Sequence, residues 1–235
     1  MLKKYLKKLP IYKFYAKYQS KKYCKHLKEL SDNFHREGEL ILKDFAKVLN
    51  DNSIQFWLDY GTLLGYHREH DFIGHDTDID TGVFIEDAEN VKQALENNGF
   101  KLVRRYYNVD GSGLEHCYCK IGFKTTIDVF FYKRDNDSVT CYSFYPLPNI
   151  DIKKNLRKEI PFTTYACTMP FCGLKKTTFK GIDVYVPIDI EGYLIANYGP
   201  NYMIPDPNYS SSSATNIKKF TYEEKPAVGY LEIPY

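Results

Sequence analysis

The sequence predicts an α+β fold in which a mixed β-sheet is flanked by helices. Apolar residues recur at helical spacing along residues 36–49, and runs rich in aromatic and β-branched residues follow one another closely between residues 100 and 145. Strands joined by such short connections are typical of antiparallel or mixed sheets. With 235 residues, 43% of them hydrophobic, the chain can bury a substantial core as one domain with an extension.

The first expected elements are a helix, a strand and a turn. One face of residues 36–49 is apolar, and the polar residues 50–52 would end this helix. Residues 54–58 are predicted to form a buried strand, after which Gly61 turns the chain. Thr62 can then begin a helix whose free N–H groups point toward an anion, an arrangement that binds phosphate.

Later in the chain, a strand and a helix are followed by a run of strands. Residues 79–85 are expected to form a strand and residues 87–98 a helix that stops at Gly99. Three prolines between residues 146 and 161 favour a surface crossing there. Further strands are expected at residues 100–107, 114–121, 125–132, 139–145 and 182–186, and a helix at residues 189–197.

The net charge of +2 is unevenly distributed. Residues 1–28 contain ten lysines and no acid, so the remaining residues carry a net charge of −8. Tyrosines and leucines alternate with these lysines, and such a segment can lie on an anionic membrane surface. The alternatives are a solvated helical extension whose aromatic residues pack on the body, and a nucleic-acid-binding arm, for which no recognition motif is present.

Composition disfavours export, a membrane span and a zinc ribbon. No run approaches the roughly 18 apolar residues that a membrane-spanning helix needs, and no apolar segment with a cleavage site follows the lysine-rich start. The six cysteines lack paired spacing, so reduced thiols in a cytoplasmic protein are expected. The alternative is a zinc site formed by Cys117, Cys119, Cys167 and Cys172.

Three acids occupy alternate positions in one short motif. Asp76, Asp78 and Asp80 would point to one side of an extended backbone, because successive strand side chains alternate faces. Strand-like sequences lie on both sides of them, so we expect the acids at the edge of the core, where charges need a cation or another partner. A solvated acidic loop is the alternative.

A further acid, Asp128, lies inside a strongly β-forming run. An unpaired charge in such a strand is costly. If its strand lies beside that of Asp78 and Asp80, the three carboxylates converge and suit Mg²⁺ or Mn²⁺, which prefer oxygen ligands. An ion pair between Asp128 and a lysine or arginine is the alternative.

These motifs resemble a known family. A Gly-Thr pair after a strand, an Asp-x-Asp on the next strand and a third Asp on a later strand resemble the nucleotidyltransferase superfold. The longer motif of residues 57–68, Trp-Leu-Asp-Tyr-Gly-Thr-Leu-Leu-Gly followed by Arg68, is similar to the LicD/fukutin family of phosphoalcohol transferases. That family commonly reads Ile-Pro-Trp-Asp-Asp-Asp-Ile-Asp where residues 73–80 read Ile-Gly-His-Asp-Thr-Asp-Ile-Asp, so one acid and an aromatic residue are absent here.

The resemblance covers residues 36–207 and implies three parts of the chain. Residues 1–35 would form a basic helical extension and residues 36–207 a nucleotidyltransferase-like catalytic domain. Residues 208–235 would form a polar C-terminal tail.

The carboxylates would provide the catalytic and metal-binding groups. Asp78 and Asp80 are expected to bind the metal, with Asp76 as an additional ligand or a supporting acid. Asp128 is expected to act as a ligand or as the base that accepts the proton of the acceptor hydroxyl. Mg²⁺ is the expected cofactor, with Mn²⁺ second.

Three residues would bind the donor phosphate. Gly61 and Thr62 would contact it through the backbone and the hydroxyl, and Arg68 would hold it with a bidentate guanidinium. An ion pair of Arg68 with Glu69 or Asp71 is the alternative.

The activity that the resemblance implies is transfer of a phosphoalcohol, such as phosphocholine, ribitol phosphate or glycerol phosphate. The donor would be a CDP-activated alcohol, the acceptor a sugar hydroxyl of a cell-surface glycan or lipid-linked saccharide, and the product CMP. We expect the protein on the cytoplasmic side, with peripheral membrane contact and no nucleic-acid partner. The alternatives are a nucleotidyltransferase that transfers NMP from an NTP, and a noncatalytic adaptor of a membrane-associated glycan assembly complex.

Overall fold

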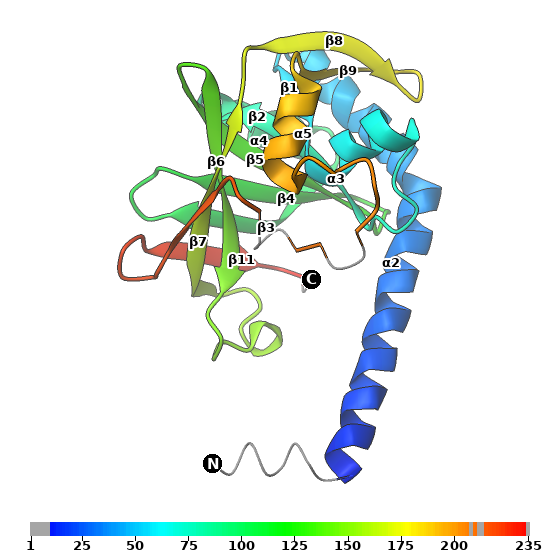
Figure 1. Cartoon of the computed structure of the whole chain (residues 1–235), viewed down its shortest axis with the longest axis vertical. Coiled ribbons are helices and arrows are strands. Elements are labelled where there is room, and N and C mark those ends of the chain that lie inside the picture. Colours follow the sequence, from blue (N-terminus) through cyan, green and yellow to red (C-terminus); the bar gives the residue numbers. More distant parts are fainter. Residues whose placement is uncertain (1–9, 207–208, 211–213, 234–235) are drawn as a thin grey trace.

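The structure is a computed structural model that describes residues 10–206, 209–210 and 214–233, with side chains described from residue 21 onward. Figure 1 shows a body built from a curved sheet and short helices, from which one long helix projects. This helix, α2 (Pro10–Asp51), is continuous across residue 35, where the predicted extension would end. No helix in the described ranges is both long and apolar enough to span a bilayer.

The main sheet closes into a barrel, which the sequence did not predict. Strand β6 pairs with β7 along its length and with the C-terminal part of β5, and this second pairing closes the ring. The mixed α+β class is therefore confirmed, with a barrel at its centre (Figure 1). The strands of the ring are, in order, β5 (Thr126–Asp135), β4 (Leu114–Lys120), β3 (Phe100–Asn108), β11 (Ala227–Leu231), β7 (Glu159–Pro170) and β6 (Ser138–Pro146).

Three strands extend the sheet beyond the ring. Strand β10 (Ile217–Phe220) adds to β7, while β2 (Asp78–Phe84) adds to β5 and β1 (Phe56–Leu58) adds to β2. The β2–β5 pair is parallel, whereas the other pairs of described strands are antiparallel. Parallel pairing aligns the starts of β2 and β5, the ends at which the candidate acids lie.

Short helices and a hairpin cover this extended part of the sheet. Helix α3 (Tyr60–Leu64) continues into a π-helical turn at Gly65–Glu69. Helix α4 (Ala88–Asn97) lies where the sequence predicted a helix and buries Val91, Ala94 and Leu95. The further elements are α5 (Ile190–Tyr198) and the two-stranded hairpin of β8 (Leu174–Phe179) and β9 (Ile182–Pro187).

The C-terminal half of α2 packs on the core through its apolar face. Ile41, Phe45 and Leu49 are fully buried there. Residues 21–29 are exposed, and most of the lysines of the predicted basic extension lie among residues whose side chains the structure does not describe. The basic character of the whole extension therefore stays a prediction.

Two expectations about the later part of the chain were wrong in part. The predicted surface crossing at residues 146–161 is correct for residues 147–158, which contain no strand and no buried residue, but β7 begins at Glu159 and includes Pro161. The predicted polar tail contributes β10 and β11, and β11 lies between β3 and β7 in the ring. Prolines and polar residues led to these expectations. Local composition does not show that a segment forms a strand when that strand is stabilised by pairing with strands distant in sequence.

Candidate active site

The acids of β2 and β5 lie side by side. Asp80 is the direct register partner of Asp128, and Asp78 lies two residues earlier on the same face of β2. Burial, followed by the charge of Asp128, raises the pKa of Asp78 to about 7. Burial and the charges of Asp78 and Asp128 likewise raise the pKa of Asp80 well above its usual range. The predicted position of Asp128 beside this strand is confirmed, whereas the chemical roles of the three acids stay predictions.

Asp76 lies in the loop just before β2 and faces the same place. Its backbone N–H donates to the carbonyl of Ile73 at 3.0 Å, and burial raises the pKa of its carboxyl to about 6. A Cβ atom built on Gly61 would lie 3.1 Å from Asp80 Oδ2 and 3.6 Å from both carboxylate oxygens of Asp76. A residue without a side chain at position 61 therefore lets the two acids approach the turn.

The turn after β1 is tied to Asp80 by reciprocal hydrogen bonds. The Gly61 N–H donates to Asp80 Oδ2 at 2.9 Å, and the Asp80 N–H donates to Thr62 Oγ1 at 2.9 Å. At the start of α3, Asp59 accepts from the Tyr60 N–H at 2.8 Å. The N–H groups of Tyr60 and Gly61 thus donate to protein carboxylates. The Gly61 N–H would have to exchange Asp80 for a phosphate oxygen to make the predicted contact. The phosphate-binding roles of Gly61 and Thr62 stay predictions.

A buried arginine lies in the same rung of the sheet. Arg104, Cys117, Asp128 and Asp80 are successive register partners across β3, β4, β5 and β2. Arg104 Nη2 lies 3.7 Å from Asp128 Oδ1 and donates to Cys117 Sγ at 2.8 Å. Asp128 therefore belongs to the acid cluster and also faces an arginine, as the alternative expected. The sequence analysis missed Arg104, although of two adjacent strand residues, here Arg104 and Arg105, one must point inward.

Two further acids near the cluster were missed. Glu115 lies two residues from Cys117 on β4, and burial together with the charge of Asp128 raises its pKa well above the usual range. Asp59 is fully buried and accepts hydrogen bonds from Tyr132 at 2.5 Å and Tyr193 at 3.1 Å. Burial raises the pKa of Asp59 to about 6. For Asp59, the signal in the sequence was an acid directly after the apolar strand Phe56–Leu58.

Arg68 lies on the wall of a cavity of about 990 Å³ that also contacts Gly61 and Asp76. Its Nε donates to Glu69 at 2.8 Å and its Nη1 to the carbonyl of Tyr202 at 3.1 Å. The alternative of an ion pair with Glu69 is therefore present, whereas Asp71 instead pairs with Lys180 at 2.6 Å. Of the candidate acids, Asp76 lines this cavity, opposite Tyr198 at the end of α5 and Tyr202 and Tyr209 in the segment that follows.

The carboxylates suit a hard cation by their chemistry. In the ranges that the structure describes, no group of three or more His, Cys, Asp and Glu side chains is already arranged around a metal position, and this includes the four cysteines of the zinc alternative. Asp76 Oδ2 and Asp128 Oδ1 are nevertheless buried and accept no hydrogen bond. Buried carboxylate oxygens without donors, crowded beside other acids, are the groups that Mg²⁺ or Mn²⁺ would stabilise.

Comparison with known proteins identifies the family. The family model described as LicD/FKTN/FKRP, nucleotidyltransferase domain, matches residues 53–189, which include all the candidate ligands and donor-binding residues. Mouse ribitol-5-phosphate transferase FKTN is 27% identical over 191 residues, covering 79% of this chain and 37% of that protein. Human ribitol 5-phosphate transferase FKRP is 23% identical over 173 residues, covering 72% and 32%.

The chain thus spans about a third of the length of these curated relatives. Among solved structures, the lincomycin-bound lincosamide antibiotic adenylyltransferase LnuA aligns with a TM-score of 0.39 and 15% identity, covering 65% of this chain and 78% of that one. The family match extends over more than half of the chain, and it confirms the predicted resemblance. The chain therefore belongs to the LicD/FKTN/FKRP family.

Proposed function

We propose that this chain transfers a phosphoalcohol, of the ribitol phosphate, phosphocholine or glycerol phosphate type, from a CDP-activated donor to a sugar hydroxyl of a cell-surface glycan, with release of CMP. The observation that carries this proposal is the group of buried acids on β2 and β5, beside which Asp76 of the preceding loop lines a cavity of about 990 Å³. Family relatives that are ribitol-5-phosphate transferases support it.

The acids would hold one or two Mg²⁺ ions. Asp78, Asp80 and Asp128 are the proposed ligands, and Asp76 supplies an additional carboxylate from the loop. When bound, the ion would neutralise charge on the transferred phosphoryl group and lower the pKa of the attacking hydroxyl. Asp128 has a second candidate role as the acceptor of the hydroxyl proton, because one of its oxygens accepts no hydrogen bond.

The cavity would bind the donor. Its volume lies in the range that proteins use for ligands of nucleotide size, about 300–1,000 Å³. Arg68 lies on its wall, and the contacts with Glu69 and Tyr202 fix the plane of its guanidinium. A planar guanidinium held in this way can grip two oxygens of a pyrophosphate.

A second candidate is transfer of NMP from an NTP, because the matched family model describes a nucleotidyltransferase domain. The same acids would then serve attack at the α-phosphorus, with pyrophosphate as product. A noncatalytic adaptor is disfavoured because burying several acids together is costly and needs a compensating function.

Peripheral attachment to an anionic membrane on the cytoplasmic side is part of the proposal. The N-terminal part of α2 projects from the body (Figure 1), and its described residues 21–29 are exposed. Lys21 and Lys22 lie there, and Tyr23 is 62% exposed. Basic and aromatic side chains on a free helix suit a lipid headgroup surface.

Product analysis tests the proposed function. The protein would be incubated with Mg²⁺, a glycan acceptor and, in turn, a panel of CDP-alcohols, CTP and ATP, and the products would be identified by mass spectrometry. We expect CMP and a phosphoalcohol-modified acceptor from one CDP-alcohol. Pyrophosphate released from CTP or ATP would instead establish a nucleotidyltransferase activity. If no donor gives a product, the noncatalytic adaptor is the function that remains.

A further inference from the structure

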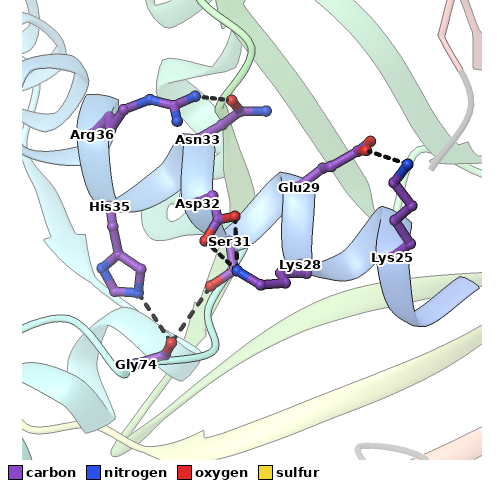
Figure 2. A network of polar contacts seen from close by, with 9 residues as sticks. All are labelled: Lys25, Lys28, Glu29, Ser31, Asp32, Asn33, His35, Arg36 and Gly74. Carbon is purple, nitrogen blue, oxygen red and sulfur yellow. Dashed lines mark hydrogen bonds and ion pairs between the residues drawn. The ribbon is translucent and has the colours of Figure 1, made fainter.

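Helix α2 contacts the loop that carries Asp76. Figure 2 shows Ser31 and His35 directed at the carbonyl oxygen of Gly74, at 3.5 and 3.0 Å. Gly74 lies two residues before Asp76 and four before β2 begins. One face of α2 therefore fixes the entry of the first strand of the acid cluster.

The same part of α2 also holds the entry of the second strand. Glu37 Oε2 accepts the backbone N–H groups of Lys124 and Thr125 at 2.8 and 2.9 Å. Thr125 immediately precedes β5, and Asp128 follows three residues later. Hydrogen bonds from N–H groups to a carboxylate are stronger than those between neutral groups.

Lys180 contacts the loop that carries Asp76 at its N-terminal end. Lys180, in the turn between β8 and β9, lies 2.6 Å from Asp71 and 3.8 Å from Glu39 of α2. The loop is thus attached to α2 directly through Gly74 and indirectly through Asp71. Because α2 is one continuous helix, the starts of both strands are attached to the same element.

We propose that Glu37 is a positioning residue for the carboxylate site, because it fixes the start of β5 and with it the place of Asp128 relative to Asp76, Asp78 and Asp80. The inference rests on the proposed metal-dependent function. Ligating groups must be held within about 0.5 Å of their working positions, and the groups that hold them determine metal affinity. Residues 31–37 lie outside the matched family range of 53–189.

Three variants of the full chain test this role. Glu37→Ala removes both hydrogen bonds to the start of β5. Glu37→Gln removes the charge but keeps a carbonyl oxygen, which can accept both N–H groups because both now bond to the single oxygen Oε2. Asp32→Ala is the matched control, since Asp32 is an exposed acid of the same helix that pairs with Lys28 at 3.1 Å (Figure 2).

The measurements are Mn²⁺ affinity by electron paramagnetic resonance and amide hydrogen exchange of residues 124–128, with thermal unfolding recorded in parallel. We expect Glu37→Ala to weaken Mn²⁺ binding about tenfold or more, as loss of a group that orients ligands typically does, and to speed exchange at residues 124–128. Glu37→Gln, whose neutral oxygen still accepts both N–H groups, should lie between Glu37→Ala and the wild type, and Asp32→Ala should remain close to the wild type in both.

Wild-type Mn²⁺ affinity in Glu37→Ala, even with a lower melting temperature, would overturn the inference and leave Glu37 with a role in stability alone. If the wild-type protein itself binds no Mn²⁺, the proposed function loses its metal. The inference is then decided by exchange: unchanged exchange at residues 124–128 in Glu37→Ala overturns it, and exchange that is faster in Glu37→Ala than in Glu37→Gln, and unchanged in Asp32→Ala, supports it.

Discussion

At the scale of single residues, the site consists of acids that the fold buries without supplying enough hydrogen-bond donors. Asp76 Oδ2 and Asp128 Oδ1 accept no hydrogen bond, and the pKa values of Asp78 and Asp80 are raised by burial and by their acidic neighbours. Such a group lowers the stability of the folded protein unless a cation offsets the repulsion.

Asp78→Asn and Asp80→Asn should each reduce metal-dependent turnover by on the order of 10³-fold, because an amide is a much poorer Mg²⁺ ligand than a carboxylate. The melting temperature without metal should be unchanged or raised, since each change replaces an acid whose ionised form is disfavoured by burial and by its acidic neighbours. The control is Asp135→Asn, which alters an exposed acid on β5. Near-normal turnover in either variant would remove the metal-site assignment.

Arg68→Lys should raise the KM for the donor although it keeps the charge, because a point charge replaces a planar fork. A lysine also cannot donate at the same time to Glu69 and to the carbonyl of Tyr202 in the way that the Arg68 guanidinium does. Steady-state kinetics with the CDP-alcohol measure the effect. Unchanged KM and kcat would make Arg68 a structural ion-pair residue.

His116 gives the folded protein a specific pH dependence. Burial, and then the charges of Arg105 and Lys92, lower its pKa from 6.5 to about 3. The unfolded chain therefore takes up a proton below pH 6.5 that the folded chain does not, so the free energy of unfolding falls as the pH decreases from about 6.5 toward 3. The slope is about 1.4 kcal/mol per pH unit.

Denaturant unfolding of the wild type and of His116→Gln at pH 6.5 and pH 5 isolates this contribution. Between these values the wild type should lose about 1.6 kcal/mol more than the variant, which has no imidazole to protonate. Equal losses in the two proteins would show that His116 is protonated without cost in the folded state.

At the scale of elements, local pattern was informative where a strand or helix shows its own periodicity. The apolar face of residues 36–49, the strands at the start of the sheet and the helix now seen as α4 were predictable for that reason. β11 was not, because Ala227–Leu231 depends on pairing with β3 and β7, which are distant in sequence. Pro161 similarly suggested a turn, although it lies in β7 opposite Val228.

The site followed the same division. The carboxylates of β2 could be inferred because alternation fixes the face on which they lie. The contacts of Arg104 with Asp128, and of Glu37 with the start of β5, could not, because each joins segments whose adjacency only the folded topology determines.

Deleting residues 1–28 should leave catalysis largely intact and reduce binding to anionic liposomes. The deletion removes ten lysines but keeps Ser31, His35 and Glu37, which contact the site loops. Co-sedimentation should also weaken in the wild type as salt is raised and the Debye length falls to about 8 Å near physiological ionic strength. Unchanged lipid binding with a lower melting temperature would instead make the segment part of the fold.

At the scale of the whole molecule, β5 links the barrel to the site. Its N-terminal part lies beside β2 and carries Asp128, while its C-terminal residues 133–135 pair with β6 and close the ring. The barrel therefore provides a rigid base for one half of the site, and α2 fixes the entries of both strands.

The most direct test of the central claim is the anomalous scattering of Mn²⁺ in crystals of the protein with a CDP-alcohol. We predict a peak coordinated by carboxylates of Asp78, Asp80 and Asp128, at the roughly 2 Å distances that oxygen ligands give, with the donor's pyrophosphate on the Arg68 side. The absence of a peak there, with Asp128 still facing only Arg104, would contradict the assignment of these acids as a metal-dependent transfer site.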